Sequence, residues 1–312
     1  MEKVIIVLGP TCSGKTAASI ELALALGAEI VSADSMQVYK GMDIGTAKPS
    51  KEELESVPHH LINIIEPFEE FSAGRFVEEA LPAIKRLHGQ GRIPVITGGT
   101  GLYIRALTRG LFSAPPADTE LREKLLAMEI ERKGSLYEML LKEDPSAAQA
   151  ISPGDTRRIV RGLEVSIKTG TAMSALQKNL TAPMPFEFIK IGLQRDRAEL
   201  YNLINKRVDW MMQAGLLDEV KRIIGSVQGA KLSKTAMQAI GYKELGEFLN
   251  GLCTLEEAVP LIKRNTRRYA KRQTTWFKKE EDVLWVDVTG ATGREVIAAR
   301  IFPVVKGAGI NL

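Results

Sequence analysis

The chain has few cysteines and no long apolar run. Cys12 and Cys253 are its only cysteines, too few for a disulfide framework or a zinc cluster, which favours a reducing, cytoplasmic setting. No apolar stretch reaches the length of a membrane span. A strand pattern begins almost at Met1 without a cleavage pattern, so we expect neither a membrane anchor nor a secretory leader.

The chain also lacks a strong charge imbalance. Its net charge of +4, from 42 basic and 38 acidic residues, is too small to indicate nucleic-acid binding, so any basic signal must be local. A hydrophobic share of 45% and a charged share of 26% are typical of globular proteins. The length of 312 residues suits one large domain, or one domain with an insertion.

The most specific motif is G-x-x-x-x-G-K-T at residues 9–16. An apolar, β-branched run at 3–8 precedes it and a helix-forming stretch at 17–26 follows, which is the strand–loop–helix context of a phosphate-binding loop. Glycines let backbone N–H groups surround an anion, Lys15 supplies a positive charge and the Thr16 hydroxyl can ligate Mg²⁺. The alternative is a glycine-rich turn with a solvated lysine. The predicted site comprises Gly9, Pro10, Thr11, Cys12, Ser13, Gly14, Lys15 and Thr16.

Two further strand ends carry polar groups. Asp34 follows the strand pattern at 29–33, and Thr100 lies in the glycine-rich turn 98–101 after the strand pattern at 92–97. Ligands bind at the carboxyl ends of parallel strands, so both side chains should lie near the phosphate loop. The alternatives are a turn-capping role for Asp34 and a tight strand–helix turn at 98–101. No acidic residue follows the strand pattern at 92–97, which weakens a conventional ATPase assignment.

The secondary-structure pattern divides the chain. Strand patterns vanish over 117–184, where helical ones dominate, and resume at 186–193. We therefore expect an α/β fold with a parallel sheet of the P-loop NTPase type, flanked by helices and built from 1–116 and 185–312. An all-helical insertion at 117–184 interrupts it, and residues 169–185 should form an irregular return linker.

Several finer features can be compared with the structure. Ser72 should cap a helix that Pro82 kinks or shortens at its start. Asp196 and Glu199 form a variant of the capping box. Residues 283–288 can form a closing strand, whereas the tail after Gly290 carries no clear pattern.

Two helices carry local basic signals. Asp155 can cap a helix on which Arg157 and Arg161 share a face. Six of the ten residues from 263 to 272 are lysine or arginine and none is acidic, in a helix that a Thr254 capping box begins. Such runs are often merely solvated faces, but this local density favours a polyanionic partner.

Several segments together resemble the bacterial tRNA dimethylallyltransferases, also called tRNA isopentenyltransferases. The resemblance implies transfer of a dimethylallyl group from dimethylallyl diphosphate to N6 of the adenine next to the tRNA anticodon, position 37, with release of diphosphate. It also implies Mg²⁺ as cofactor, the anticodon stem-loop as partner and a cytoplasmic enzyme, which we expect to be monomeric. The matching segments follow family order over nearly the whole chain and are 9–16, 34–39, 98–103, 157–161, 238–243 and 271–276.

The same resemblance assigns roles to individual residues. Asp34 would be the general base on the adenine amine, Thr100 would lie near the reacting centre, and Arg207 would reach the diphosphate. Cys12 stands where the family more often has alanine, and the zinc finger of the eukaryotic relatives is absent, so the insertion and the basic helix must hold the tRNA. The implied tRNA contacts are Asp34, Ser35, Met36, Gln37, Thr100, Arg122, Arg157, Arg158, Ile159, Val160, Arg161, Gln238, Gly241, Tyr242 and Lys243.

Two other functions share the phosphate loop. A small-molecule or nucleotide kinase would account for residues 9–16, but not for the missing acid or the basic helix. An isopentenyltransferase acting on free AMP, ADP or ATP would share the core without needing the insertion.

Overall fold

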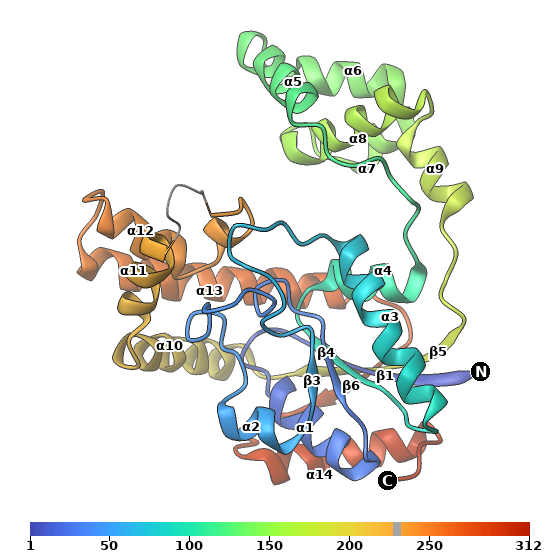
Figure 1. Ribbon diagram of the computed structural model, residues 1–312, viewed down its shortest axis with the longest axis vertical. Helices are drawn as coiled ribbons and strands as arrows, with labels where there is room; N and C mark the ends of the chain where they lie inside the picture. Colours follow the sequence, from blue (N-terminus) through green and yellow to red (C-terminus); the bar gives the residue numbers. More distant parts are fainter. Residues whose placement is uncertain (227–231) are drawn as a thin grey trace. The chain divides into compact units, whose positions relative to one another are not determined.

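The computed structural model describes residues 1–226 and 232–312, which form two compact units (Figure 1). Met1–Arg105 with Pro185–Leu312 form the first unit, and Ala106–Met184 form the second. The second unit begins before the expected residue 117, because the two chain segments that enter and leave it meet. A Cβ atom on Gly110 would lie 1.9 Å from the carbonyl oxygen of Ala182.

The first unit is built on a sheet of six parallel strands in the order β3-β2-β4-β1-β5-β6. This confirms the predicted α/β class with a parallel sheet. Strand β1, near the centre, is apolar and buried from Val4 to Leu8, as expected for a strand covered by helices on both faces. The strands are β1 (Glu2–Leu8), β2 (Ile30–Ser32), β3 (His59–His60), β4 (Val95–Gly98), β5 (Phe186–Gln194) and β6 (Val283–Asp287).

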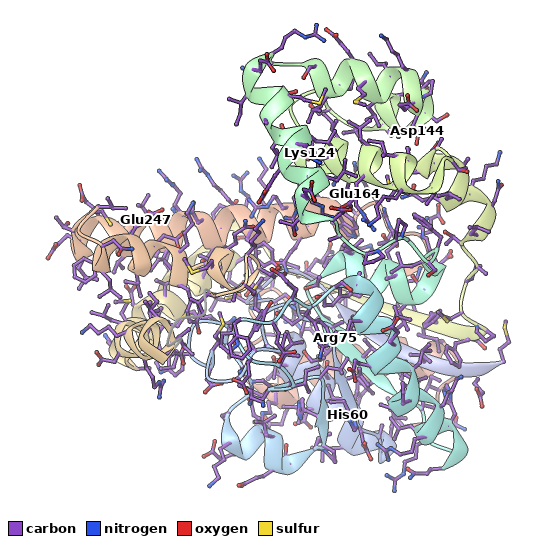
Figure 2. The ribbon with its side chains drawn as sticks, turned by 45° about the horizontal axis from the view of Figure 1, so that its top comes forward. His60, Arg75, Lys124, Asp144, Glu164 and Glu247 are labelled. Atoms are coloured by element: carbon purple, nitrogen blue, oxygen red, sulfur yellow. The ribbon has the colours of Figure 1, made fainter. Side chains whose placement is uncertain are left out.

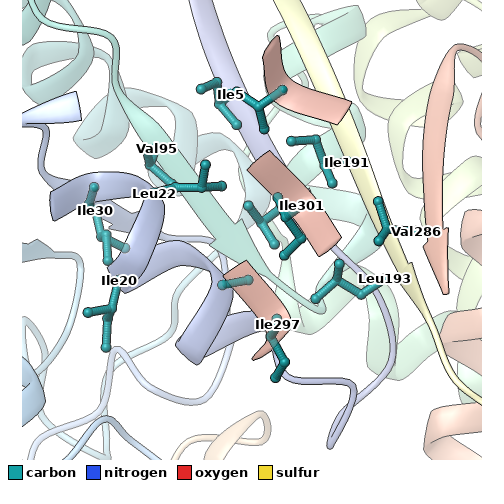
Figure 3. Close-up of a cluster of buried hydrophobic side chains, with 14 of the residues drawn as sticks. Ile5, Ile20, Leu22, Ile30, Val95, Ile191, Leu193, Val286, Ile297 and Ile301 are labelled. Carbon is teal, nitrogen blue, oxygen red and sulfur yellow. The ribbon is translucent and has the colours of Figure 1, made fainter. Parts of the chain in front are cut away.

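Helices α1 (Lys15–Leu26) and α14 (Arg294–Gly307) cover one face of this sheet. Ile5 of β1 and Ile191 of β5 belong there to one buried cluster with Ile297 and Ile301 of α14 (Figure 3). Val4, Ile6 and Leu8 alternate with these positions along β1 and are also fully buried, so the opposite face is covered as well.

The helices of the first unit connect and flank the strands. They are α1 (Lys15–Leu26), α2 (Lys51–Ser56), α3 (Ala73–Gly89), α4 (Gly101–Arg109), α10 (Arg197–Gln213), α11 (Leu216–Ser226), α12 (Tyr242–Leu249), α13 (Leu255–Phe277) and α14 (Arg294–Gly307), with a 3₁₀ turn η1 (Ala236–Gln238). The last turn of α4 belongs to the second unit. The described part of the chain holds no helix with the length and apolar character that a bilayer crossing requires.

Three details of these helices bear on the expectations from the sequence. Helix α3 begins directly after its cap Ser72 and continues through Pro82, so the proline does not move its start. Asp196 caps α10, but Glu199 does not complete a capping box, because its carboxylate binds Arg195 and the backbone N–H of Gly290. The tail after Gly290 forms α14, whose buried positions 297, 301 and 305 have helical spacing that sequence inspection missed.

Beyond the last turn of α4, the second unit contains α5 (Thr119–Glu131), α6 (Ser135–Glu143), α7 (Pro145–Ala150), α8 (Thr156–Thr169) and α9 (Met173–Leu180). Asp155 caps α8 as predicted, through the backbone N–H of Arg158. The expected irregular linker at 169–185 is wrong, because it contains α9. Buried Asp144 accepts hydrogen bonds from the backbone N–H and the hydroxyl of Ser174, and so fixes the first turn of that helix (Figure 2).

Candidate active site

The phosphate loop joins β1 to α1 in a conformation that depends on glycine. Gly9 and Gly14 have φ values of 150° and 98°. A Cβ atom on Gly9 would lie 2.7 Å from the carbonyl oxygen of Leu193, and one on Gly14 would lie 2.8 Å from Cδ1 of Ile297. Since Gly14 is the N-cap of α1, the loop ends at a helix N-terminus, whose N–H groups favour an anion.

Lys15 is held inside this loop. Its Nζ donates to the carbonyl oxygen of Pro10 at 2.9 Å. Burial lowers the pKa of Lys15 to about 8; Asp34 opposes this change and Arg207 adds to it. The Lys15 ammonium therefore lies within the field of both groups, and a bound phosphate would favour its charged form.

Asp34 follows β2 at the same edge of the sheet. Its Oδ1 accepts from the backbone N–H groups of Met36 at 2.9 Å and Gln37 at 3.4 Å, so one oxygen does cap the turn. Among the described residues, none donates a hydrogen bond to Oδ2. Burial raises the pKa of Asp34, although the Met36 hydrogen bond and Lys15 partly oppose it. One carboxylate thus has a structural oxygen and an oxygen that can accept a proton.

Thr100 is connected to the Asp34 loop. Its Oγ1 accepts from the backbone N–H of Ser35 at 3.0 Å and lies 3.3 Å from the Ser35 hydroxyl. Its own N–H donates to the carbonyl oxygen of Ala33 at 3.3 Å. The ends of β2 and β4 approach closely here, since a Cβ atom on Gly98 would lie 2.1 Å from the carbonyl oxygen of Ala33. The structure therefore brings Asp34 and Thr100 together at the sheet edge.

Gln273 of α13 completes the site and was not singled out as a site residue from the sequence. Its Oε1 accepts from the backbone N–H of Thr11 at 2.8 Å, and its Nε2 donates to the carbonyl oxygen of Gly99 at 2.9 Å. This buried amide thereby joins the phosphate loop to the glycine-rich turn. A usable signal was its position between buried Ala270 and Phe277 on the apolar face of the helix.

Two other side chains border this arrangement. Arg207, expected at the diphosphate, donates through Nη1 to the Thr11 hydroxyl at 3.3 Å. Tyr269 lies beside Thr100 and Gln273, and burial followed by the negative charge of Asp34 raises its pKa. Cys12, within the loop, is buried in an apolar cluster with Leu200, Ile204 and Ala270, which favours a packing role for its thiol.

The Thr16 hydroxyl is one group in the loop that a metal could use. The Thr16 side chain takes part in no hydrogen bond within the described ranges, so its oxygen is available at the start of α1. Those residues contain no group of three or more His, Cys, Asp or Glu side chains suited to a metal ion. This donor set fits Mg²⁺, which commonly combines one or two protein oxygens with phosphate oxygens and water.

In the second unit, the expected tRNA-binding arginines differ in their surroundings. Arg122 forms a two-point contact with Glu164, with both distances 2.8 Å, and Arg161 binds the same carboxylate (Figure 2). Burial would raise the pKa of Glu164, but hydrogen bonds from Arg122, from the Asp118 N–H and from Arg161 outweigh it and lower the pKa to about 2. Arg157 and Arg158 are exposed at the start of α8.

Three of the residues expected at the tRNA have buried side chains. Ile159 and Val160 are buried in the core of the second unit, so their side chains serve packing. Tyr242 is also buried, and its hydroxyl donates to Glu219. Gln238 and Lys243, by contrast, are exposed.

The basic helix is α13, with the expected Thr254–Glu257 capping box. Its buried face includes Ile262, Ala270 and Phe277, whereas Arg267 donates to Oδ1 of Asn205. The exposed basic residues on it are Arg264, Arg268, Lys271 and Arg272.

Residues 37–280 match the family described as IPP transferase, and residues 2–64 match isopentenyl transferase. The tRNA dimethylallyltransferase of Thermodesulfovibrio yellowstonii is 47% identical over 303 residues, covering 96% of each chain. That of Symbiobacterium thermophilum is 48% identical over 305 residues, covering 97% of this chain and 94% of the relative.

Solved structures give the same result. The tRNA isopentenylpyrophosphate transferase of Bacillus halodurans has a TM-score of 0.73 at 42% identity, covering 98% of this chain and 96% of its own. A eukaryotic dimethylallyltransferase acting on tRNA has a TM-score of 0.85 at 31% identity, covering 99% of this chain and 79% of its own.

Proposed function

The chain belongs to the IPP transferase family, and on this premise we propose that it transfers a dimethylallyl group from dimethylallyl diphosphate to tRNA. The acceptor is N6 of the adenine next to the anticodon, at position 37, and diphosphate is released. The observation that carries this proposal is the meeting of a phosphate loop with Asp34, whose Oδ2 accepts no hydrogen bond from the described residues, at one sheet edge.

The phosphate loop holds the diphosphate of the donor. Its N–H groups and the Lys15 ammonium face the phosphate oxygens, and Arg207 adds a second cation beside Thr11. Mg²⁺ held by Thr16 and the phosphate oxygens would neutralise further charge on the leaving group. Together these groups stabilise the charge that grows on diphosphate as its bond to the allylic carbon breaks.

Asp34 acts on the acceptor. The N6 lone pair is delocalised into the adenine ring, so the amine is a poor nucleophile. As nitrogen bonds to the allylic carbon, that carbon releases the diphosphate oxygen, and Oδ2 of Asp34 takes the proton from nitrogen. Thr100, hydrogen-bonded to Ser35, keeps this loop next to the glycine-rich turn.

The acceptor base has to leave its stack to reach Asp34, and water has to be kept away from the allylic carbon. The exposed arginines of α8 and α13 suit the phosphates of the anticodon stem-loop. One chain supplies every group named, which supports a monomer. We place the enzyme in the cytoplasm, where its tRNA is found.

The test is transfer from labelled dimethylallyl diphosphate with Mg²⁺ and without ATP. Acceptors are an anticodon stem-loop with adenine at position 37, the same stem-loop with guanine there, and AMP. We expect label and pyrophosphate only with the first. Label on AMP would identify an enzyme of free nucleotides, and ATP-dependent phosphorylation without prenyl transfer would identify a kinase.

A further inference from the structure

A buried carboxylate occupies a concave group of backbone N–H donors in the loop after Asp34. Glu219 of α11 is 2% exposed. Its oxygens accept from the N–H groups of Asp43 at 2.9 Å, Ile44 at 2.8 Å and Gly45 at 3.0 Å. Successive N–H groups of this kind form an anion-binding nest, and here the anion is the protein's own side chain.

Tyr242 also binds Glu219, at the oxygen that accepts from Gly45. Its hydroxyl donates to Oε1, and its ring lies so close to Gly45 that a Cβ atom there would be 2.4 Å from the ring. Burial and the charge of Glu219 raise the pKa of Tyr242, so it remains a donor. The family-like segment 238–243 thus contributes a contact to the loop through this tyrosine.

The nest is connected to the candidate base. Gln37 lies three residues after Asp34, and its Nε2 donates to the carbonyl oxygen of Ala47 at 3.2 Å. The Lys48 side chain is 4% exposed and joins the carbonyl oxygen of Tyr39 to the Asp43 carboxylate, at 2.5 and 2.7 Å. Residues 37–39 are therefore held to residues 43–48, which Glu219 holds to α11.

We propose that Glu219 is a positioning residue for the prenyl-transfer reaction, fixing the 43–45 nest and through it the loop that presents Asp34. This inference rests on the proposed function for its kinetic part. In the described part of the chain, Glu219 forms its hydrogen bonds with residues 43–45 and Tyr242 and none with the phosphate loop, so its effect should fall on the chemical step and not on donor binding.

The test combines single-turnover transfer with amide hydrogen exchange in Glu219→Gln. The variant keeps the volume but places an NH₂ group against N–H donors. We expect the rate at saturating substrates to fall about ten- to a hundredfold, as for a reacting group displaced by about an ångström. The Kd for dimethylallyl diphosphate should stay within about threefold of the wild-type value, since the substitution leaves the groups that bind the donor unchanged.

Exchange should rise at residues 43–45 and also at 34–37, with β1 unchanged. Tyr242→Phe removes a single donor and should shift both readouts slightly in the same direction. The control is Glu129→Gln, because Glu129 also accepts two backbone N–H groups, of Gly134 and Leu136, and should leave both readouts unchanged.

The positioning role would be overturned if Glu219→Gln exchanged faster only at 43–45, transferred at the wild-type rate, or lost rate and donor affinity equally. If the wild type itself transfers no prenyl group, the proposed function fails. Exchange at 34–37 then decides the positioning role alone.

Discussion

The two oxygens of Asp34 have different surroundings, which makes Asp34→Asn more informative than Asp34→Ala. Asparagine keeps an oxygen for the N–H groups of Met36 and Gln37, so the turn should persist. It cannot take a proton, so single-turnover transfer should fall about a hundred- to ten-thousandfold with both substrates still bound. A near-normal rate for Asp34→Asn would remove Asp34 as the base.

The pH dependence of the chemical step follows from the same residue. Burial raises the pKa of Asp34, and its neighbours Lys15 and Tyr269 are respectively a cation and a neutral phenol. A base must be unprotonated, so the rate should fall as pH drops through this raised pKa, above the ordinary range of aspartate. Single-turnover rates from pH 4 to 8 measure it, with Asp34→Asn as the control that should lack this limb.

Lys15 should reduce stability while it serves binding. Its pKa of about 8, against an ordinary 10.5, corresponds to about 3 kcal/mol of unfavourable burial of the charge. Lys15→Met should therefore raise the free energy of unfolding by about 1–3 kcal/mol at pH 7 and abolish diphosphate binding.

The lowered pKa of Lys15 makes the stability of the folded chain depend on pH. Between pH 8 and 10.5 the unfolded chain keeps the Lys15 proton that the folded chain has lost, so the wild type gains stability there. The advantage of Lys15→Met should shrink over that range. Urea unfolding at pH 7 and pH 10 tests this, and a difference that does not depend on pH would contradict it.

At the scale of elements, the sequence predicted those features that depend on residues adjacent in the chain. The β1–loop–α1 unit was predictable because its apolar run, its glycines and its helix formers are contiguous. Gln273 and Glu219 were not, because their partners lie far away in sequence, at Thr11 and Gly99 and at 43–45. A buried polar side chain on an apolar helix face indicates a partner without identifying it.

Helix α13 should stabilise the phosphate loop through Gln273. Gln273→Ala leaves the N–H of Thr11 and the carbonyl oxygen of Gly99 without their partner, which should cost about 1–3 kcal/mol of unfolding free energy. Diphosphate affinity should fall as well, because the loop loses its link to the turn. Urea unfolding and calorimetric binding measure the two effects, and Thr275→Ala, at an exposed position on the same helix, is the control.

At the scale of the whole molecule, the candidate chemical groups belong to the first unit, whereas exposed arginines occur in both. The family resemblance placed tRNA contacts at 157–161 as a block. The structure divides that block by burial, since Ile159 and Val160 are core residues and Arg157 and Arg158 face solvent. A contiguous motif thus combines fold-forming residues with possible contact residues, and only the packing separates them.

Arg157→Ala should weaken tRNA binding by removing one phosphate contact. The slope of log K against log salt should flatten by about one for that contact, since fewer counterions are released. Neutralising Arg268 and Arg272 of α13 should act in the same way. Affinity for dimethylallyl diphosphate should remain unchanged, because that site lies at the phosphate loop.

Lys124→Ala is the matched control in the second unit, as an exposed lysine already paired with Glu120. Equal losses for tRNA and dimethylallyl diphosphate would indicate misfolding, and an unchanged salt slope would remove these arginines from the tRNA-binding surface.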